Sequence, residues 1–242
     1  MPNAVNLHTP SMVDDGFRRW LAAWWPTHCL VCGESGAGGR DCCRACADTL
    51  PWNRIACPLC ALPLPAPAVA CGACLRRRPT LGAVTAACVY SSPLDRLLPR
   101  FKFHGDLAAG RLLAQWMLDA CSALPRPDAL VPVPLHRARL RSRGYDQALE
   151  LARPLARALR VPLCANVLER RRATAPQSEL SALQRRRNVR AAFAVRDGAP
   201  LPAHVVLVDD VMTTGATLHA AATALRRAGV QRVDAWVCAR VP

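Results

Sequence analysis

The stretch Val205-Val206-Leu207-Val208-Asp209-Asp210-Val211-Met212-Thr213-Thr214-Gly215-Ala216-Thr217-Leu218 decides the fold of this chain. A mostly apolar run, residues 203–208, ends abruptly at two carboxylates, which is typical of a buried parallel strand as it leaves its sheet. A turn of threonine and glycine follows, and residues 216–227 have helical composition. The sequence therefore predicts a strand, an acidic edge, a small-residue turn and a helix, in that order.

The turn lies at the amino end of the predicted helix. Unpaired backbone N–H groups and the positive end of the helix dipole favour phosphate there. Two acids beside a phosphate site would repel the phosphate unless they have another role. The simplest such role is to accept hydrogen bonds from sugar hydroxyls and to help hold Mg²⁺. Paired acids after a strand also occur in nucleotide hydrolases and phosphoacceptor domains, and such a turn can simply cap a helix. The length of the motif favours phosphoribosyl binding over these alternatives.

This motif resembles the phosphoribosyl pyrophosphate loop of type I phosphoribosyltransferases. The resemblance implies an α/β fold with a parallel sheet flanked by helices, and Mg²⁺ bound together with phosphoribosyl pyrophosphate. It assigns catalytic roles to Asp209 and Asp210, which would contact the ribose 2′- and 3′-hydroxyls. The residues that would bind the substrate around its 5′-phosphate are Val211, Met212, Thr213, Thr214, Gly215, Ala216 and Thr217.

Charge and composition narrow the possible partners. The 242 residues carry a formal charge of +15, and only one basic residue, Lys102, is a lysine. A polyphosphate sugar or nucleic acid would suit so basic a chain, although genome bias toward arginine is an alternative explanation. No apolar run approaches the roughly 20 residues of a membrane span, and Asp14-Asp15 does not suit a secretory signal. We therefore expect a cytoplasmic protein without a membrane span.

The cysteines form an internal repeat. Four Cys-x-x-Cys pairs occur, and each repeat joins two of them across a step of eleven residues, which is typical of a zinc ribbon. The predicted Zn²⁺ ligands are Cys29, Cys32, Cys43 and Cys46 for one structural ion, and Cys57, Cys60, Cys71 and Cys74 for the other. Disulfides are disfavoured because the remaining cysteines are odd in number and scattered. Interleaved pairing, and Cys42 in place of Cys43, remain open.

Three segments are predicted. Residues 1–27 carry a short amphipathic stripe at helical spacing, which would pack on the next module or contact a membrane surface or nucleic acid; its residues are Phe17, Trp20, Leu21 and Trp24. Residues 28–78 form the double zinc ribbon, whose final Arg76-Arg77-Arg78 could contact phosphates. Residues 81–242 form the phosphoribosyltransferase-like domain. Its expected strands are 83–90, 129–131, 164–168, 191–195 and 233–241, and its further helices are 93–100, 107–121 and 148–160.

Two basic features of this domain are candidate anion contacts. Residues 101–106 are predicted to be extended, with Lys102 and His104 on opposite faces, and Lys102 is either a solvated charge or a phosphate contact. After the strand 129–131 and Pro134, arginine occupies every second position, at Arg137, Arg139, Arg141 and Arg143. Ligands of open α/β sheets bind just outside the carboxyl ends of strands. The arginine segment is therefore predicted to be a mobile anion-binding loop, and phosphoribosyltransferases hold pyrophosphate in the loop at this place.

Four motifs together resemble the ComF family: the paired knuckles, P-V-P-L-H-x-x-R-L-R-x-R-G-Y-D-Q from residue 132, Q-S-x-L-S-x-x-x-R-R-x-N-V from residue 177, and the acidic loop. This resemblance covers the chain from Cys29 onward. It implies a phosphoribosyltransferase-like protein linked to DNA uptake in natural competence, with a protein of the competence machinery as a further partner.

Two functions follow as hypotheses. In the first, the chain is an enzyme that binds phosphoribosyl pyrophosphate with Mg²⁺ and transfers phosphoribose to an unidentified acceptor. In the second, the sugar-phosphate pocket and basic loops bind single-stranded DNA without catalysis. Binding of DNA should then fall steeply with salt concentration.

Overall fold

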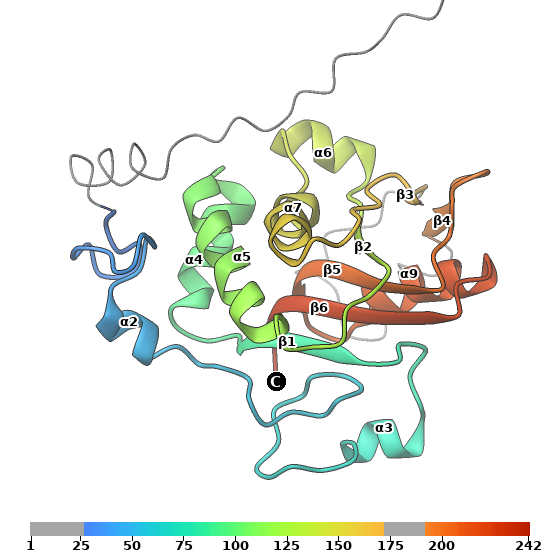
Figure 1. Ribbon diagram of the computed structural model, residues 1–242, viewed down its shortest axis with the longest axis horizontal. Coiled ribbons are helices and arrows are strands. Elements are labelled where there is room, and N and C mark those ends of the chain that lie inside the picture. The colour runs from blue at the N-terminus through green and yellow to red at the C-terminus, as the bar shows by residue number, and fades with distance from the viewer. Residues whose placement is uncertain (1–26, 172–191) are drawn as a thin grey trace, which may run out of the picture. The chain divides into compact units, whose positions relative to one another are not determined.

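The computed structural model describes residues 27–171 and 192–242 (Figure 1). The chain divides into two compact units between Thr49 and Leu50. The predicted helical stripe between Phe17 and Trp24, and the Q-S-x-L-S-x-x-x-R-R-x-N-V motif that begins at residue 177, lie outside the described residues.

The described part of the first unit is a small ribbon, residues 27–49. Its first knuckle is closed by a hydrogen bond from the backbone N of Cys29 to the carbonyl oxygen of Glu34, 2.7 Å long. The helix α2, Arg44–Asp48, follows, and the Cys43 side chain caps it by accepting a hydrogen bond from the Cys46 N–H. Short, tight turns of this kind hold few apolar side chains, so a bound metal would supply much of the stability of such a module.

A four-stranded parallel sheet forms the centre of the second unit, in the order β1-β6-β5-β2 (Figure 1). The strands are β1 (Val84–Val89), β2 (Ala129–Pro132), β5 (His204–Met212) and β6 (Arg232–Arg240). The central strands β5 and β6 are almost continuously apolar because both of their faces are covered. The predicted α/β fold with a parallel sheet is therefore confirmed.

The strand β5 extends further than the apolar run of the sequence. It includes Asp209 and Asp210 and ends at Met212, because β6 pairs with it as far as Met212↔Arg240. On its other edge, β2 pairs with β5 only up to Pro132↔Val208. Among the described residues, the last positions of β5 therefore pair with a strand on one side only, and the acids lie within this projecting end rather than beyond the strand.

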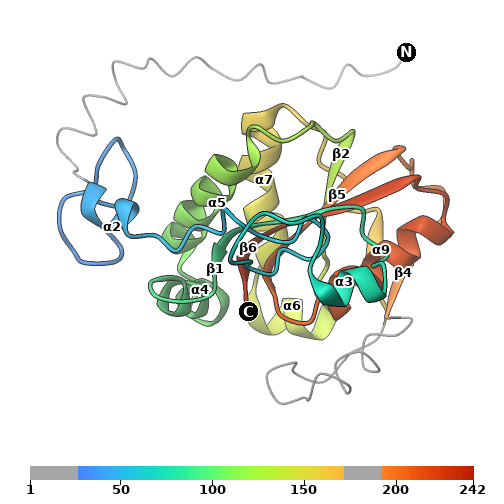
Figure 2. The same ribbon diagram turned by 90° about the horizontal axis from the view of Figure 1, so that it is seen from below.

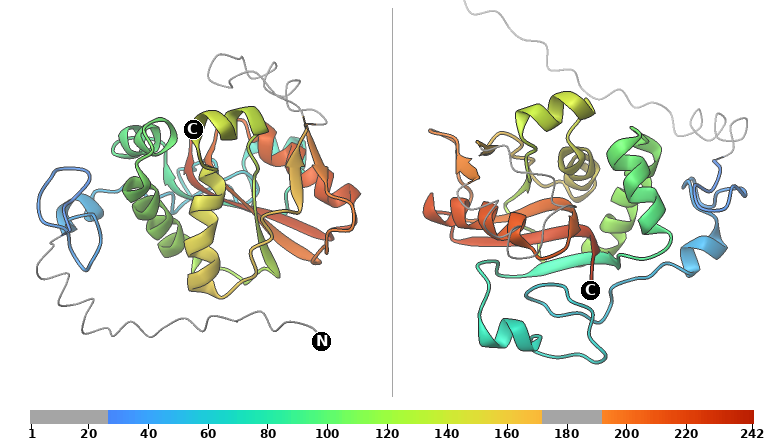
Figure 3. Two further views of the ribbon diagram at one scale, coloured as in Figure 1. Left: turned by 90° about the horizontal axis from the view of Figure 1, so that it is seen from above. Right: turned by 180° about the vertical axis from the view of Figure 1, so that it is seen from behind.

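Helices cover both faces of the sheet (Figures 2 and 3). On one face lie α5 (Leu107–Cys121) and α7 (Gln147–Leu159), which pack against each other, with α4 (Leu94–Phe103) beside α5. On the other face, α9 (Ala216–Arg227) buries Leu218 and Leu225 in one cluster with Val205 and Leu207 of β5. The sequence predicted the bounds of α5 and α9 correctly.

The structure corrects the prediction for residues 101–104. They are not extended, because α4 continues to Phe103 and His104 is its C-cap. The reason lies in the core: Leu94, Leu97, Leu98 and Phe101 are all buried, at the spacing of one helix face. The local alternation of polar and apolar residues at 101–104 is overridden by this packing.

Two strands form a small antiparallel ribbon. The strand predicted at 191–195 is present as β4, Phe193–Val195. It pairs with β3, Leu168–Arg170, which lies further along the chain than the strand expected at 164–168. Near residue 164, only Leu163 forms an isolated parallel bridge, to Leu130 of β2.

The second ribbon of cysteines belongs to the same unit as the sheet. It contains the helix α3, Gly72–Arg76, and it lies along the outer edge of β1 (Figure 2). The backbone N of Val84 donates to Pro58 O, and that of Val89 donates to Pro51 O, each over 2.8 Å. Because β1 is an edge strand of the parallel sheet, these bonds occupy backbone groups that would otherwise be open to another strand.

Candidate functional site

Asp209 and Asp210 form the acidic centre of the projecting end of β5. Asp210 is buried, with 9% of its surface exposed, and its backbone N–H donates to Asp209 Oδ1 over 2.9 Å. Burial, and then the neighbouring charge of Asp210, raise the pKa of Asp209 to about 8. Two carboxyls whose charges interact do not both ionise easily in a desolvated site. The pair is therefore able to bind a proton, a hydroxyl donor or a cation.

Lys102 reaches this acidic pair from α4. Its Nζ lies 2.9 Å from Asp210 Oδ1. The helical rather than extended backbone at residue 102 places the lysine on the last turn of α4. The single lysine of the chain thus lies beside the carboxylate that sequence analysis assigned to the sugar.

Asp146 is a further acid near the pair, and sequence analysis did not single it out. It is the N-cap of α7, where Oδ1 accepts from the Leu149 N–H over 3.1 Å, and Oδ2 accepts from the Leu135 N–H over 2.9 Å. Burial raises its pKa, and the charge of Asp210 acts in the same direction. Asp146 therefore ties the segment after Pro134 to α7 and adds a third carboxyl near Asp210. The only signal for it was its place in the Gly-Tyr-Asp-Gln sequence.

The arginine segment is a helix, not the predicted mobile loop. The helix α6, Arg137–Arg143, begins at His136, whose side chain accepts from the Ala138 N–H, and it ends at Gly144 with φ +80°. Residues two apart on a helix differ by about 200° in direction. The alternating arginines therefore fall into two pairs: Arg139 and Arg143 are half-buried, whereas Arg137 and Arg141 are exposed.

The inward pair of arginines connects α6 to its surroundings. Arg143 donates to Gln147 Oε1 over 2.8 Å, and its guanidinium carbon lies 5.0 Å from the centre of the Phe103 ring. Burial, followed by the charge of Arg143, lowers the pKa of Arg139. Arg139 is thus a guanidinium held in a partly desolvated position.

Arg170, the last residue of β3, is a cation near the site that the sequence did not predict there. It is buried, with 8% of its surface exposed, and its guanidinium lies 5.4 Å from the centre of the Phe193 ring. Burial and the charge of Arg139 lower its pKa, whereas the charge of Asp209 raises it. Arg139, Arg170 and Asp209 therefore share one electrostatic environment. The only sequence signal for Arg170 was its position as the first residue of the run Arg170-Arg171-Arg172.

The turn 213–215 connects the acids to α9. Gly215 has φ +73°, and a Cβ atom there would lie 2.4 Å from Met212 Cε. The left-handed backbone favours glycine at this position, and an added Cβ would also require the terminal methyl of Met212 to move. The Thr214 Oγ1 accepts from the Ala216 N–H over 3.4 Å. The turn thus presents hydroxyls and the first backbone N–H groups of a twelve-residue helix, a favourable combination for phosphate.

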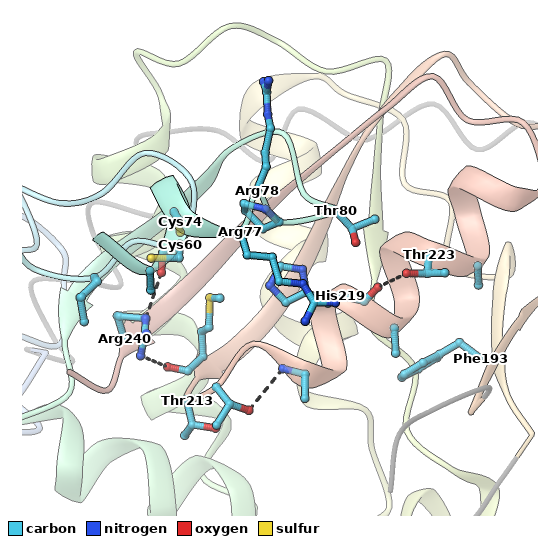
Figure 4. Close-up of a pocket in the computed structure, with 18 of the residues that line it drawn as sticks. Cys60, Cys74, Arg77, Arg78, Thr80, Phe193, Thr213, His219, Thr223 and Arg240 are labelled. Atoms are coloured by element: carbon cyan, nitrogen blue, oxygen red, sulfur yellow. Dashed lines mark hydrogen bonds between the residues drawn. The ribbon is translucent and has the colours of Figure 1, made fainter. Parts of the chain in front are cut away.

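A cavity of about 1490 Å³ adjoins the other side of the turn (Figure 4). It lies between the second ribbon and α9, and both Thr213 and Thr214 line it. Its cations are Arg77, Arg78, Arg227 and Arg240. Its lining, as far as the structure describes it, includes no aspartate or glutamate. Asp209 and Asp210 do not line it, so the turn contributes to two different surfaces.

Both cysteine tetrads fit a tetrahedral metal. In each of the two sets of four, the sulfur atoms lie within 4.8 Å of one another. The Cys32–Cys43 and Cys60–Cys71 sulfur pairs are each 3.6 Å apart, close to the separation of about 3.8 Å that Zn–S bonds of ~2.3 Å require. The sets are those predicted from the sequence, and neither contains an interleaved pair.

The thiols of the tetrads differ among themselves in acidity, since burial raises the pKa of Cys46 and Cys74, whereas Cys29 and Cys71 have lowered values. Despite burial, backbone hydrogen bonds from Cys43 and Cys32 lower the pKa of Cys29 to about 6, and those from Cys74 help to lower that of Cys71 to about 7. Burial raises the pKa of Cys42 to about 12, and its Sγ lies 3.5 Å from the Cys43 carbonyl oxygen. Cys43, not Cys42, belongs to the first tetrad.

Comparison with known sequences assigns two domains. Residues 146–242 match the family described as phosphoribosyl transferase domain, and residues 20–75 match the family described as double zinc ribbon domain. Within the described residues, no helix has the length and apolar character needed to cross a membrane.

Several curated proteins are similar over most of their length. Competence protein F of Haemophilus influenzae is 39% identical over 159 residues, which cover 62% of this chain and 69% of that protein. The DNA utilization protein YhgH of Escherichia coli K12 is 38% identical over 160 residues, with the same coverage. Competence protein ComFC of Bacillus subtilis is 32% identical over 145 residues, which cover 58% of this chain and 56% of that protein. Among solved structures, orotate phosphoribosyltransferase from Aeropyrum pernix is 24% identical with a TM-score of 0.35, covering 55% of this chain and 60% of that one.

Proposed function

The chain belongs to the ComF family of competence proteins, and from this premise we propose that it binds phosphoribosyl pyrophosphate with Mg²⁺ and transfers phosphoribose to an acceptor. One observation carries the proposal. The two acids lie at the end of β5, where pairing with β2 has already stopped, and the glycine turn follows directly. A sugar can therefore approach the acids from that side while its phosphate meets the amino end of α9.

Each part of the substrate has a complementary group in this proposal. The 5′-phosphate binds the hydroxyls and N–H groups of Thr213–Thr217, and the ribose hydroxyls donate to Asp209 and Asp210. The pyrophosphate lies toward Arg139 and Lys102, with Arg137, Arg141 and Arg143 adding positive potential. Asp209 and Asp210 supply the oxygen ligands that Mg²⁺ prefers, and the bound ion would neutralise part of the pyrophosphate charge.

The proposed reaction breaks the bond between C1 of the ribose and the pyrophosphate oxygen. The bonding electrons leave with pyrophosphate, while positive charge develops on C1 and a nitrogen of the acceptor supplies the new electron pair. Arg139 is half-buried and Arg170 is buried before the reaction begins, so little desolvation is needed to stabilise the departing charge. The carboxylates of Asp209 and Asp210 keep the sugar oriented and lie near the developing cation.

Calorimetry tests the binding step. Phosphoribosyl pyrophosphate and Mg²⁺ should give a measurable binding heat with the unaltered protein, and none with the Asp209→Asn/Asp210→Asn double variant. The variant Asp197→Asn, in the exposed turn after β4, is the matched control and should bind normally. An unaltered protein without binding heat would disprove the proposal. Release of pyrophosphate in the presence of candidate nitrogen bases then tests transfer.

A second candidate function is non-catalytic binding of single-stranded DNA, and the basic cavity beside α9 favours it. Four arginines and no acid line this cavity in the described residues, and relatives of the chain are named for competence and DNA utilization. Affinity for an oligonucleotide should fall steeply as salt rises, because bound phosphates release counterions. The double variant Arg77→Gln/Arg78→Gln should weaken this binding, whereas Asp209→Asn/Asp210→Asn should leave it nearly intact. Equal retention of DNA at low and high salt would exclude this electrostatic mode of DNA binding.

A further inference from the structure

Arg240 lies between the second cysteine tetrad and the phosphate turn (Figure 4). It is the last residue of β6, and its side chain makes hydrogen bonds to both places. Its Nε donates to the carbonyl oxygen of Cys60 over 3.0 Å, and its Nη1 donates to the carbonyl oxygen of Met212 over 3.3 Å. One guanidinium therefore joins segments that are far apart in the sequence.

The two acceptor carbonyls belong to two different sites. Cys60 is a member of the second tetrad, so a bound metal fixes its backbone. Met212 is the last residue of β5 and directly precedes the turn. Its side chain abuts Gly215, since a Cβ on that glycine would lie 2.4 Å from Met212 Cε. A displacement of Met212 would therefore be transmitted to the turn.

The planar fork of arginine suits this position. Two of its nitrogens can donate in different directions within one rigid plane, whereas a lysine offers a single, rotating ammonium. Arg240 is half-buried, and its Nη1 also donates to the carbonyl oxygen of Val241. The guanidinium therefore donates to three backbone carbonyls, and independent movement of the Cys60 or Met212 segment would break one of these hydrogen bonds.

We infer that Arg240 is a positioning residue that couples metal occupancy of the second tetrad to the conformation of the phosphate-binding turn. The inference rests on the proposed function only for the identity of the ligand. With metal bound, Cys60 holds the guanidinium, the guanidinium holds the Met212 carbonyl, and the turn keeps its N–H groups aligned. Without metal, the Cys60 backbone is no longer fixed, so the hydrogen bonds of Arg240 no longer hold the turn in place.

Coupling between two binding sites is reciprocal. If metal in the second tetrad favours binding at the turn, a ligand at the turn must raise the affinity for that metal by the same factor. Arg240 acting only as a structural tie would not make metal affinity depend on the ligand.

Competition for zinc between the full chain and a chelator tests this coupling. Ribose 5-phosphate is the probe, because it carries the sugar and terminal phosphate and needs no added Mg²⁺ in the presence of a chelator. In the Cys43→Ser variant, which retains only the second site intact, saturating ribose 5-phosphate should raise the affinity for zinc roughly tenfold, as measured by the zinc transferred at equilibrium to a competing chromophoric chelator. In Arg240→Met this equilibrium should not respond to the sugar, while Arg226→Met, which removes an exposed charge from α9 outside the cavity, should respond normally.

Hydrogen exchange of the backbone provides a readout that needs no ligand. Chelation of the second zinc should accelerate exchange at residues 213–217 in the unaltered chain, and Arg240→Met should show the faster exchange with zinc still bound. Exchange that is indifferent to zinc would overturn the inference, as would a zinc affinity that does not change with a sugar shown by calorimetry to bind. If the sugar does not bind but exchange at the turn still follows zinc, the proposed function fails and the coupling stands.

Discussion

Asp209 and Asp210 illustrate how position in a sheet sets the chemistry of single residues. Both lie on one strand, and burial together with the charge of Asp210 raises the pKa of Asp209 to about 8. The free site therefore holds a proton at neutral pH. A sugar hydroxyl or a cation that binds there must compete with this proton, so binding of a metal complex should strengthen as pH rises toward 8.

The raised pKa also makes a prediction for stability. An unfolded aspartate titrates near pH 4, so between about pH 4 and pH 8 the folded chain keeps a proton that the unfolded chain has lost. The free energy of unfolding should therefore fall as pH rises through this interval and level off above it. Asp209→Asn should flatten this dependence between pH 6 and pH 8, as measured by denaturant unfolding. Equal slopes for the variant and the unaltered protein would contradict the assignment.

Gly215 allows a second test at the scale of one residue. An alanine there pays about 1–2 kcal/mol for the left-handed backbone and also meets Met212 Cε at 2.4 Å. Gly198 has nearly the same φ, +71°, but open space around its Cβ position. We expect Gly215→Ala to reduce stability more than Gly198→Ala, and to be the only one of the two that weakens phosphate binding. Thermal unfolding and calorimetry of both variants measure the two effects.

At the scale of elements, α6 separates arginines that look equivalent in the sequence. The helix turns Arg139 inward and leaves Arg141 exposed. Arg139→Gln should therefore weaken binding of phosphoribosyl pyrophosphate about tenfold, the effect of losing one charged hydrogen bond. Arg141→Gln, which removes the same charge, should have a much smaller effect that disappears at higher salt. Equal losses for the two variants would support the extended loop expected from the sequence instead.

The two ribbons make a prediction about metal content. Each tetrad holds four sulfurs at distances that suit Zn²⁺, so purified protein should contain two zinc ions per chain. Cys43→Ser should reduce the content to about one ion. Cys42→Ser should leave it at two, because the Cys42 thiol is buried and is not one of the four sulfurs of the first tetrad. Mass spectrometry under native conditions distinguishes these outcomes, and loss of an ion in Cys42→Ser would contradict the ligand set.

At the scale of the whole molecule, the second ribbon completes the sheet. Residues 51–58 form backbone hydrogen bonds to β1, so a fragment that begins at residue 81 exposes the edge of that strand. We expect fragment 50–242 to remain monomeric when zinc is bound, and fragment 81–242 to unfold at lower temperature and to associate through the open edge. Size-exclusion chromatography and thermal unfolding compare the two. A monomeric fragment 81–242 of equal stability would show that the ribbon is dispensable.

The sequence alone determined the features that depend on neighbouring residues. The helix at 216–227 follows from its composition and from the glycine before it, and both cysteine sets follow from their spacing. The order of strand, acids, turn and helix identified the parallel α/β fold. These features can be predicted from the sequence because helix periodicity, turn geometry and metal ligation each involve residues that are near one another along the chain.

Only the tertiary structure decided which distant residues meet. The strand β5 extends through Asp210 because β6 supports it, and α4 carries Lys102 to Asp210 because its apolar face is buried. The inward turn of Arg139 and the link from Arg240 to Cys60 also depend on packing between separate elements. No local pattern encodes these contacts, since burial and hydrogen bonding across the fold outweigh the weak preferences of short segments.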